Sequence, residues 1–297
     1  MIRAGMLFFL LGPAFDVATA DDSTPLLLDQ GTRDFLRLHE VDGRPASLQV
    51  SVVRFVPQGG YAKTPGLTVD LVSAVHVADV SYYEALNELL DDYDAVLYEL
   101  VAPEGTRIPA GGPEREGPGG IASRLQLGMK DLLDLSFQLE EVDYTGEHFV
   151  HADLSPKQFS ESMENRGESF FQLLLKAWMT ALAAPQQATV VSDVELLTAL
   201  FSSDRTRKLK TVMARQFDQM DSMMALLDGG EKGSTLITVR NERALEVLRE
   251  QLDEGRKRVA IFYGAGHMPD FAQRLATDFS LRPESRSWLD AWDLKPQ

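Results

Sequence analysis

The sequence contains no cysteine. This absence excludes disulfide bonds and every metal site built on thiolate ligands, including the zinc modules that depend on cysteine. A metal ion bound by this chain must take its ligands from histidine, carboxylate or water. The search for a site therefore turns to histidine, aspartate and glutamate side chains.

Positive charge is scarce. The chain has 29 lysines and arginines against 45 aspartates and glutamates, which gives a formal net charge of −16. A surface of this sign repels phosphate groups, which argues against a nucleic-acid partner and against an anionic membrane. A local basic run extends from Arg205 to Lys210, and we interpret it as the solvated face of a helix.

Long apolar runs are missing after the N-terminus, so we expect no membrane-spanning helix in the mature chain. The N-terminus carries Arg3, then an apolar run over residues 6–15, then Ala18-Thr19-Ala20. A basic residue, a short apolar core and a small-x-small site are the order of a secretory signal peptide. We expect cleavage of residues 1–20 after Ala20. Residues 21–297 are then exported, to the periplasm or the exterior, as a single domain without membrane attachment.

The first half of the mature chain has strand character, with Val-rich segments separated by Gly and Pro. The first two strands are consistent with a hairpin. Ser81 and Glu84 have the spacing of a capping box at the start of a helix. Strand, helix and strand then follow in the order of a βαβ unit. The expected elements are strands over residues 46–55 and 67–75, a helix over 81–93 and a strand over 95–101.

The middle of the chain is expected to be helical. Residues 103–120 are crowded with Pro and Gly, which indicates a long loop or linker. Residues 121–232 then have helical periodicity and are predicted to form an insertion lobe. A methionine stripe in its last helix is interpreted as core. The expected helices cover residues 121–141, 156–182, 191–201 and 205–227.

The C-terminal part returns to β character. Pro269 and Asp270 suit the first turn of the last helix. The expected elements are a strand over residues 234–239, a helix over 242–254, a strand over 258–263, the turn Gly264-Ala265-Gly266-His267, and a helix to about Asp278. Together these elements predict an α/β protein with a mixed β-sheet core flanked by helices. It is built from two strand-His-helix units and carries the helical insertion lobe.

Two histidines occupy the same position in the two units. His76 and His267 each follow a buried strand and precede a helix. In open parallel sheets ligands bind beyond the carboxyl ends of the strands, so both imidazoles are expected at the usual binding crevice. A helix N-terminus disfavours imidazolium, which leaves each ring able to bind a metal or to accept a proton.

Glu99 lies inside AVLYELV, a run that should be apolar throughout if it forms a buried parallel strand. A buried carboxylate needs a cation, a metal or strong donors. If the strands over 67–75 and 95–101 are neighbours, about 4.8 Å apart, His76 and Glu99 can share one ligand. Alternatively, the histidines are simply hydrogen-bonded, and Glu99 forms a structural ion pair with an arginine such as Arg240.

Other polar residues are candidates of second rank. Arg240 and Asn241 follow a predicted strand and open a helix, where Asn241 can serve merely as an N-cap. His151 and Asp153 lie in FVHADLS, where Asp153 can be merely a turn residue. The weaker candidates in FQLEEVDY are Gln138 and Asp143. Gly264 and Gly266 begin a G-x-G, but Pro269 stands in place of the third glycine of a dinucleotide fingerprint, which we therefore discard.

Four motifs, in order between about Leu67 and Phe271, carry a family resemblance. VDLVSAVHVAD, YDAVLYEL, VRNERAL and VAIFYGAGHMPDF resemble the TraB/GumN family, which is related to TIKI metalloproteases and more distantly to erythromycin esterase and ChaN proteins. That family has two G-x-x-H motifs, an intervening glutamate and an Arg-Asn motif. They carry over onto His76, Glu99, Arg240-Asn241 and Gly264 to His267. The first motif begins with Ser73 in place of glycine.

The resemblance implies a β-sheet core flanked by helices and, for TIKI members, metal-dependent peptide cleavage favouring manganese or cobalt. The leading hypothesis is an exported metal-dependent hydrolase, peptidase-like, acting on a peptide or small-molecule substrate. His76, Glu99 and His267 would hold a divalent ion, manganese, cobalt or zinc, that lowers the pKa of bound water. Glu99, Arg240 and Asn241 are the catalytic candidates, with Arg240 on the oxyanion or a substrate carboxylate.

Two alternatives remain open from the sequence. The first is a non-catalytic protein that binds or sequesters a peptide or another ligand in the same crevice. The second is a metal-free ester hydrolase, in which one histidine is the general base and Glu99 orients it or activates water.

Overall fold

The computed structural model describes residues 26–29, 31–58, 65–112, 133–168, 202, 204–217 and 233–296. The predicted signal peptide and most of the predicted insertion lobe therefore lie outside the described residues. Within the described ranges, no helix is long and apolar enough to cross a membrane.

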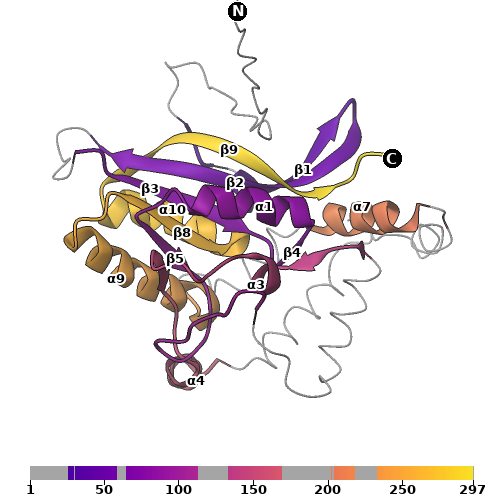
Figure 1. The fold of residues 1–297 in the computed structure, drawn as a ribbon. Coiled ribbons are helices and arrows are strands. Elements are labelled where there is room, and N and C mark those ends of the chain that lie inside the picture. Colours follow the sequence, from indigo (N-terminus) through magenta and orange to yellow (C-terminus); the bar gives the residue numbers. More distant parts are fainter. Residues whose placement is uncertain are drawn as a thin grey trace, which may run out of the picture.

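The core of the protein is a mixed sheet with the strand order β1-β2-β3-β8-β5-β7, and β9 also pairs with β2 (Figure 1). The pairs around β2 are antiparallel, whereas β3, β8, β5 and β7 run parallel. The predicted α/β class with a mixed sheet flanked by helices is confirmed. The strands are β1 (Leu36–Val41), β2 (Arg44–Pro57), β3 (Thr68–Ala74), β5 (Ala95–Tyr98), β7 (Phe149–His151), β8 (Arg258–Gly264) and β9 (Leu281–Asp293).

The central strands are buried almost throughout, as expected for parallel strands covered on both faces. In β3 and β8 nearly every residue is buried, and in β5 all four are. Helices α1, α9 and α10 pack against the sheet. The described helices are α1 (Val80–Leu90), α3 (Gln138–Glu141), α4 (Pro156–Asn165), α7 (Arg205–Phe217), α9 (Arg240–Asp253) and α10 (Met268–Asp278). Short helical turns are η1 (Gly31–Asp34), η4 (Thr235–Val239) and η5 (Ala265–His267).

Several sequence predictions agree with these elements. The hairpin is present, since β2 pairs antiparallel with β3. The helix predicted over 242–254 is α9, and the strand over 258–263 is β8. Pro269 lies in the first turn of α10 as predicted, where its missing N–H leaves no helical hydrogen bond unmade.

The condition that the strands over 67–75 and 95–101 are neighbours is not met. Strand β8 lies between β3 and β5 and pairs with both in parallel. Local sequence does not reveal this insertion, because strand order depends on where the C-terminal part of the chain returns to the sheet. Because β8 lies between β3 and β5, the turn after β8 lies between the carboxyl ends of these two strands.

The predicted strand over 234–239 is also wrong, because residues Thr235–Val239 form the π-helical turn η4. The side chain of Ser234 accepts a hydrogen bond from the backbone N–H of Ile237, which caps the turn. The run of β-branched residues suggested a strand, but this cap and the following helix α9 decide the conformation.

The predicted capping box at Ser81 is absent, because α1 begins one residue earlier and has Asp79 at its N-cap. The Asp79 carboxylate makes no cap hydrogen bond. It instead accepts from the ammonium of Lys210 (2.5 Å) and the backbone N–H of Asp293 (2.7 Å). Lys210 is buried, so the basic run from Arg205 is not wholly a solvated face.

Two helical predictions in the middle of the chain need correction. Residues 136–137 form strand β6 (Ser136–Phe137), which pairs with β4 (Val77–Ala78), and only Gln138–Glu141 after it are helical. Helix α4 begins at Pro156 with a capping box from Ser155 but ends at Asn165 rather than continuing to residue 182. Gly167, with φ of 65°, follows this end and adopts a left-handed conformation that stops the helix.

Candidate functional site

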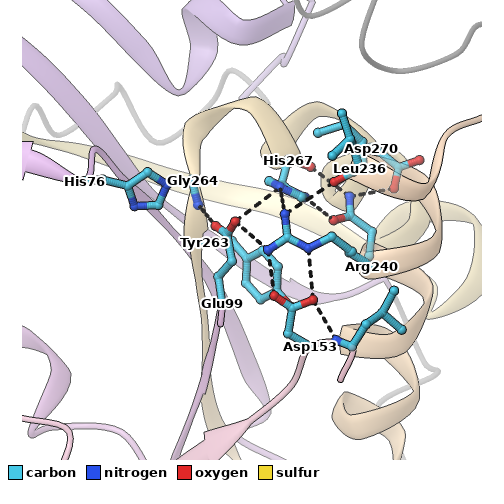
Figure 2. A network of polar contacts seen from close by, with 12 residues as sticks. His76, Glu99, Asp153, Leu236, Arg240, Tyr263, Gly264, His267 and Asp270 are labelled. Carbon is cyan, nitrogen blue, oxygen red and sulfur yellow. Dashed lines mark hydrogen bonds and ion pairs between the residues drawn. The ribbon is translucent and has the colours of Figure 1, made fainter. Parts of the chain in front are cut away.

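The carboxyl ends of β3, β8 and β5 meet at one edge of the parallel half of the sheet. His76 follows β3, Glu99 follows β5, and the turn from Gly264 to His267 follows β8. Figure 2 shows the three side chains of the predicted triad directed toward this edge, with Arg240 reaching it from the start of α9. The structure thus brings together residues that are separated by up to 191 positions in the chain.

Glu99 is held by charge and by backbone. Its Oε1 accepts a hydrogen bond from Arg240 Nη2 at 2.7 Å, and its Oε2 accepts from the backbone N–H of Gly264 at 2.8 Å. Its Oε1 also lies 3.6 Å from His267 Nε2. Burial alone would raise the pKa of Glu99. The positive charges of His267, which is protonated at the low pH where Glu99 titrates, and of Arg240 outweigh burial and lower the pKa to about 2. Glu99 is therefore a carboxylate at neutral pH.

Arg240 joins two buried carboxylates. Its Nε and Nη2 donate to Oδ1 and Oδ2 of Asp153 at 2.9 and 2.6 Å, while Nη2 also donates to Glu99. The ion pair between Glu99 and an arginine, expected as an alternative, is therefore present. Asp153 is not merely a turn residue, because its side chain is fully buried in this pair. Only Nη1 makes long contacts, at 3.5 Å to the carbonyl of Leu236 and 3.4 Å to His267 Nε2.

His267 is fixed through its other nitrogen. The Asn241 amide nitrogen donates to the carbonyl of His267 (3.1 Å) and to Asp270 Oδ2 (2.8 Å). Because both partners are acceptors, the Asn241 oxygen is the atom that faces His267 Nδ1 at 2.7 Å, so Nδ1 carries the proton. Nε2 of the neutral ring therefore presents a lone pair to Glu99 and Arg240.

Burial lowers the pKa of His267 to about 4, so the ring is neutral at pH 7. The expectation of a neutral imidazole at this position thus agrees with the structure, although burial rather than a helix terminus is the main cause. Asn241 is not an N-cap, since α9 begins before it and its side chain is fully buried against His267.

Gly264 leaves space among the three predicted site residues. A Cβ atom at this position would lie 3.3 Å from Glu99 Oε2, 3.8 Å from His76 Nε2 and 4.0 Å from His267 Cδ2. The point surrounded by the carboxylate and the two rings is therefore open because residue 264 has no side chain. This places His76 Nε2 on the same side of Glu99 as Gly264, as seen in Figure 2.

No match to a family model, to a curated protein or to a solved structure was found. The TraB/GumN resemblance therefore stays a prediction that rests on the four motifs.

His76 differs from His267 in exposure, since its ring is exposed to solvent. Its Nδ1 lies 3.0 Å from Oε1 of Gln138, whose amide nitrogen donates to the hydroxyl of Tyr144 at 2.9 Å. Gln138 was only a weak candidate in the sequence, and Tyr144 carried no signal there. Both are buried and are linked to the site through His76.

Other candidates lie outside this network. His151 contacts the carbonyl of Leu100 through Nε2 at 2.6 Å, and its ring packs against Tyr98. Asp143 accepts from Thr145 as a turn residue. Gly266 lies in the turn η5. Ser73, which stands at the position of the glycine in the first G-x-x-H motif of the similar family, is fully buried within β3. Its Oγ has no hydrogen-bond partner in the described part of the chain.

The residues around Gly264 have the donor chemistry of a divalent metal site, with two imidazole nitrogens and a carboxylate oxygen. The guanidinium of Arg240 disfavours an ion on the Oε1 side of Glu99, because it already neutralises that oxygen. Among the described residues, no group of three or more histidines and carboxylates is arranged at metal-binding distances. The donor types around Glu99 Oε2, between the rings of His76 and His267, thus fit a divalent ion, but their spacing in the described residues does not.

Proposed function

We propose that this protein is a hydrolase of carboxylic ester or amide bonds, in which His76 is the general base for water and needs no metal. One observation carries the proposal. An exposed imidazole lies beside the open point at Gly264, next to a buried carboxylate that is ionised at neutral pH. A base must be reachable by water and must be stabilised once protonated, and His76 with Glu99 meets both needs.

In this mechanism a water molecule beside Gly264 loses a proton to Nε2 of His76 as its oxygen attacks the substrate carbonyl carbon. The carbonyl becomes a tetrahedral oxyanion, and His76 becomes an imidazolium. Glu99 stabilises that positive charge through space, because its low pKa keeps it from taking the proton itself. His76 then returns the proton to the leaving alcohol or amine, which completes hydrolysis.

Arg240 has two functions in this account. Its Nε and Nη2 hold Asp153 and Glu99 in place. These contacts use every hydrogen of the two nitrogens, so neither nitrogen can donate to substrate. Its Nη1 makes only the long contacts to Leu236 and His267, so the hydrogens of Nη1 are the ones available to the oxyanion. The lone pair of His267 Nε2 orients Nη1 in the absence of substrate.

The proposal is tested by assaying the purified protein on a panel of esters and short peptides, with His76→Gln beside it. We expect kcat/KM to fall about 100-fold or more in His76→Gln, because a general base contributes at least that factor. His39→Gln, on strand β1 at the other side of the sheet, is the matched control and should keep full activity. Equal rates for His76→Gln and the wild type would refute the role of His76. Binding without turnover by the wild type would favour the sequestering alternative.

Metal-dependent hydrolysis, peptidase-like, is the second candidate, and the open point at Gly264 favours it. Nε2 of His76, Nε2 of His267 and Oε2 of Glu99 would hold the ion there. The ion would supply Lewis acidity and a lower pKa of bound water. Calorimetric titration with Mn²⁺, Co²⁺ and Zn²⁺ tests this version. It predicts one site that is lost in both His76→Gln and His267→Gln, whereas unchanged binding in both variants would eliminate it.

A further inference from the structure

The side chain of Gln138 lies between an exposed histidine and a buried tyrosine. Its Oε1 is 3.0 Å from His76 Nδ1, and its Nε2 donates to the Tyr144 hydroxyl at 2.9 Å. The backbone N–H of Gln138 also donates to the carbonyl of His76 at 3.0 Å. Gln138 and Tyr144 are 5% and 6% exposed, so the exposed ring of His76 is attached to a buried support.

The support decides which nitrogen of His76 faces the site. An imidazole free in water rotates and carries its proton on either nitrogen, whereas a fixed hydrogen-bond partner at one nitrogen selects a single tautomer. With the Gln138 oxygen at Nδ1, the proton stays on Nδ1 and the lone pair is on Nε2, the atom beside Gly264 and Glu99. The other amide orientation would place a donor at Nδ1 and a proton on Nε2, which would then be unable to act as a base.

The same arrangement occurs at the second histidine. Asn241 accepts from Nδ1 of His267 and also bonds its backbone carbonyl, as Gln138 bonds both the ring and, through its own N–H, the backbone of His76. The two amides come from α9 and from the start of α3, which are unrelated in sequence position. Each of the two strand-end histidines is therefore oriented by a buried amide through Nδ1.

We propose that Gln138 is a positioning residue for His76: its amide oxygen holds the proton on Nδ1 so that Nε2 faces Glu99, while its amide nitrogen is bonded to the Tyr144 hydroxyl. The effect on the tautomer stands on geometry alone, whereas its effect on turnover rests on the proposed function. Gln138 touches neither water nor substrate in this scheme and acts only through His76.

The tautomer is measured directly by ¹⁵N NMR of the protein labelled at its five histidines, at a pH where the rings are neutral. The His76 signals are assigned by their loss in His76→Gln. We expect a protonated Nδ1 and an unprotonated Nε2 in the wild type. Gln138→Leu should shift His76 to the Nε2-protonated form or to a mixture, and Gln138→Glu, which keeps an acceptor, should retain the wild-type pattern.

Asn87→Ala is the control for a merely structural effect. Asn87 bonds the carbonyl of Glu141 and the N–H of Asp143, so it braces the same short helix without touching His76. We expect this variant to keep the wild-type His76 pattern. The ring signals of His267 should remain unchanged in every Gln138 variant.

Activity supplies the second readout. We expect kcat to fall about 10- to 100-fold in Gln138→Leu, as for the loss of a residue that orients an active histidine, with KM little changed and with recovery in Gln138→Glu. A proton on Nε2 of His76 in the wild type, or a tautomer unchanged in Gln138→Leu, would overturn the proposal. The expected tautomers without turnover by any form would support the positioning role and refute the hydrolase.

Discussion

A single guanidinium stabilises two buried carboxylates in this protein. Arg240 bonds both oxygens of Asp153 and one of Glu99, and all three side chains are at most 11% exposed. Removing one partner from such a group leaves uncompensated charge in the interior. The loss of stability on replacing Arg240 therefore depends mainly on Glu99 and Asp153, which would remain buried without their cation.

We predict that Arg240→Met lowers the free energy of unfolding by about 3 to 5 kcal/mol. Urea denaturation followed by circular dichroism measures this change. Arg243→Met is the matched control, because Arg243 lies on the next turn of α9 and pairs with the exposed Glu246 and Glu250. Its effect should stay within about 0.5 kcal/mol. Similar losses for the two variants would contradict the buried-triad account.

His267 should make stability depend on pH. Its folded pKa is about 4, below the ordinary value of 6.5, so between these values the unfolded chain binds more protons than the folded chain. Stability is then full above pH 6.5 and falls as the pH drops through 4, by an amount on the order of 3 kcal/mol.

We predict a shallower dependence of the unfolding free energy on pH, between pH 7 and 4, in His267→Gln than in the wild type. Denaturant titrations at several pH values give this slope, which matters more than the absolute stability of the variant. His39→Gln should retain the wild-type slope. An unchanged slope in His267→Gln would show that the ring is not held neutral by burial.

At the scale of residues, the sequence identified the triad for a physical reason. A glutamate at the end of an apolar strand run and two histidines at strand-to-helix junctions are visible without any structure. Asp153 is only a second-rank candidate in the sequence, because nothing in FVHADLS shows that its carboxylate is buried against Arg240. Tyr144 gave no signal, since a tyrosine that supports Gln138 has the same local sequence as one in an ordinary core.

At the scale of elements, the turn between β8 and α10 forms the centre of the site. Gly264 ends the strand, its N–H bonds Glu99, and its missing side chain leaves room beside His76. The corresponding position of the first motif, Ser73, lies within β3 and is fully buried. The two positions therefore have different functions, even though the motifs look alike in sequence.

We predict that Gly264→Ala reduces kcat/KM by about 10- to 100-fold, because its Cβ would displace Glu99 or block the water position. Ser73→Ala is the comparison, since it removes a hydroxyl without a described partner and should leave kcat/KM unchanged. Steady-state kinetics of both variants, with melting temperatures to confirm folding, checks the prediction. Full activity in Gly264→Ala would mean that the open point is not used.

The sequence missed some elements for identifiable reasons. Strand β9 reads LRPESRSWLDAWD, and its charged residues and Pro283 suppress the strand pattern, yet it pairs with β2 along most of its length. The β-branched residues of turn η4 predict a strand, which the structure does not form there. The position of β8 between β3 and β5 depends on long-range pairing, which local periodicity does not contain.

At the scale of the whole molecule, the chain forms one mixed sheet whose parallel half holds the candidate site and whose antiparallel half is built on β2. The sequence predicted this class from the alternation of strand and helix patterns. It did not reveal the strand order, so whether the strands before His76 and Glu99 are adjacent stayed open, and β8 in fact separates them. The turn after β8 nevertheless places Gly264 beside both Glu99 and His76.

Export is a prediction that concerns the whole chain. We predict that the full sequence, expressed in a Gram-negative host, accumulates in the periplasm with an N-terminus at Asp21, because residues 1–20 have the order of a signal peptide. Intact-mass measurement of the periplasmic fraction tests this. Ala18→Asp, which disrupts the small-x-small site, should remain uncleaved. Full-length wild-type protein confined to the cytoplasm would contradict the prediction.

In the proposed mechanism His76, held beside ionised Glu99, activates water without a metal. The most direct test of this mechanism is the rate of ester or peptide hydrolysis by protein freed of metal with a chelator, with His76→Gln measured under the same conditions. We expect the metal-free wild type to keep its kcat and His76→Gln to lose about 100-fold or more. Activity that vanishes on chelation and returns with Mn²⁺, or activity that survives in His76→Gln, would contradict the mechanism.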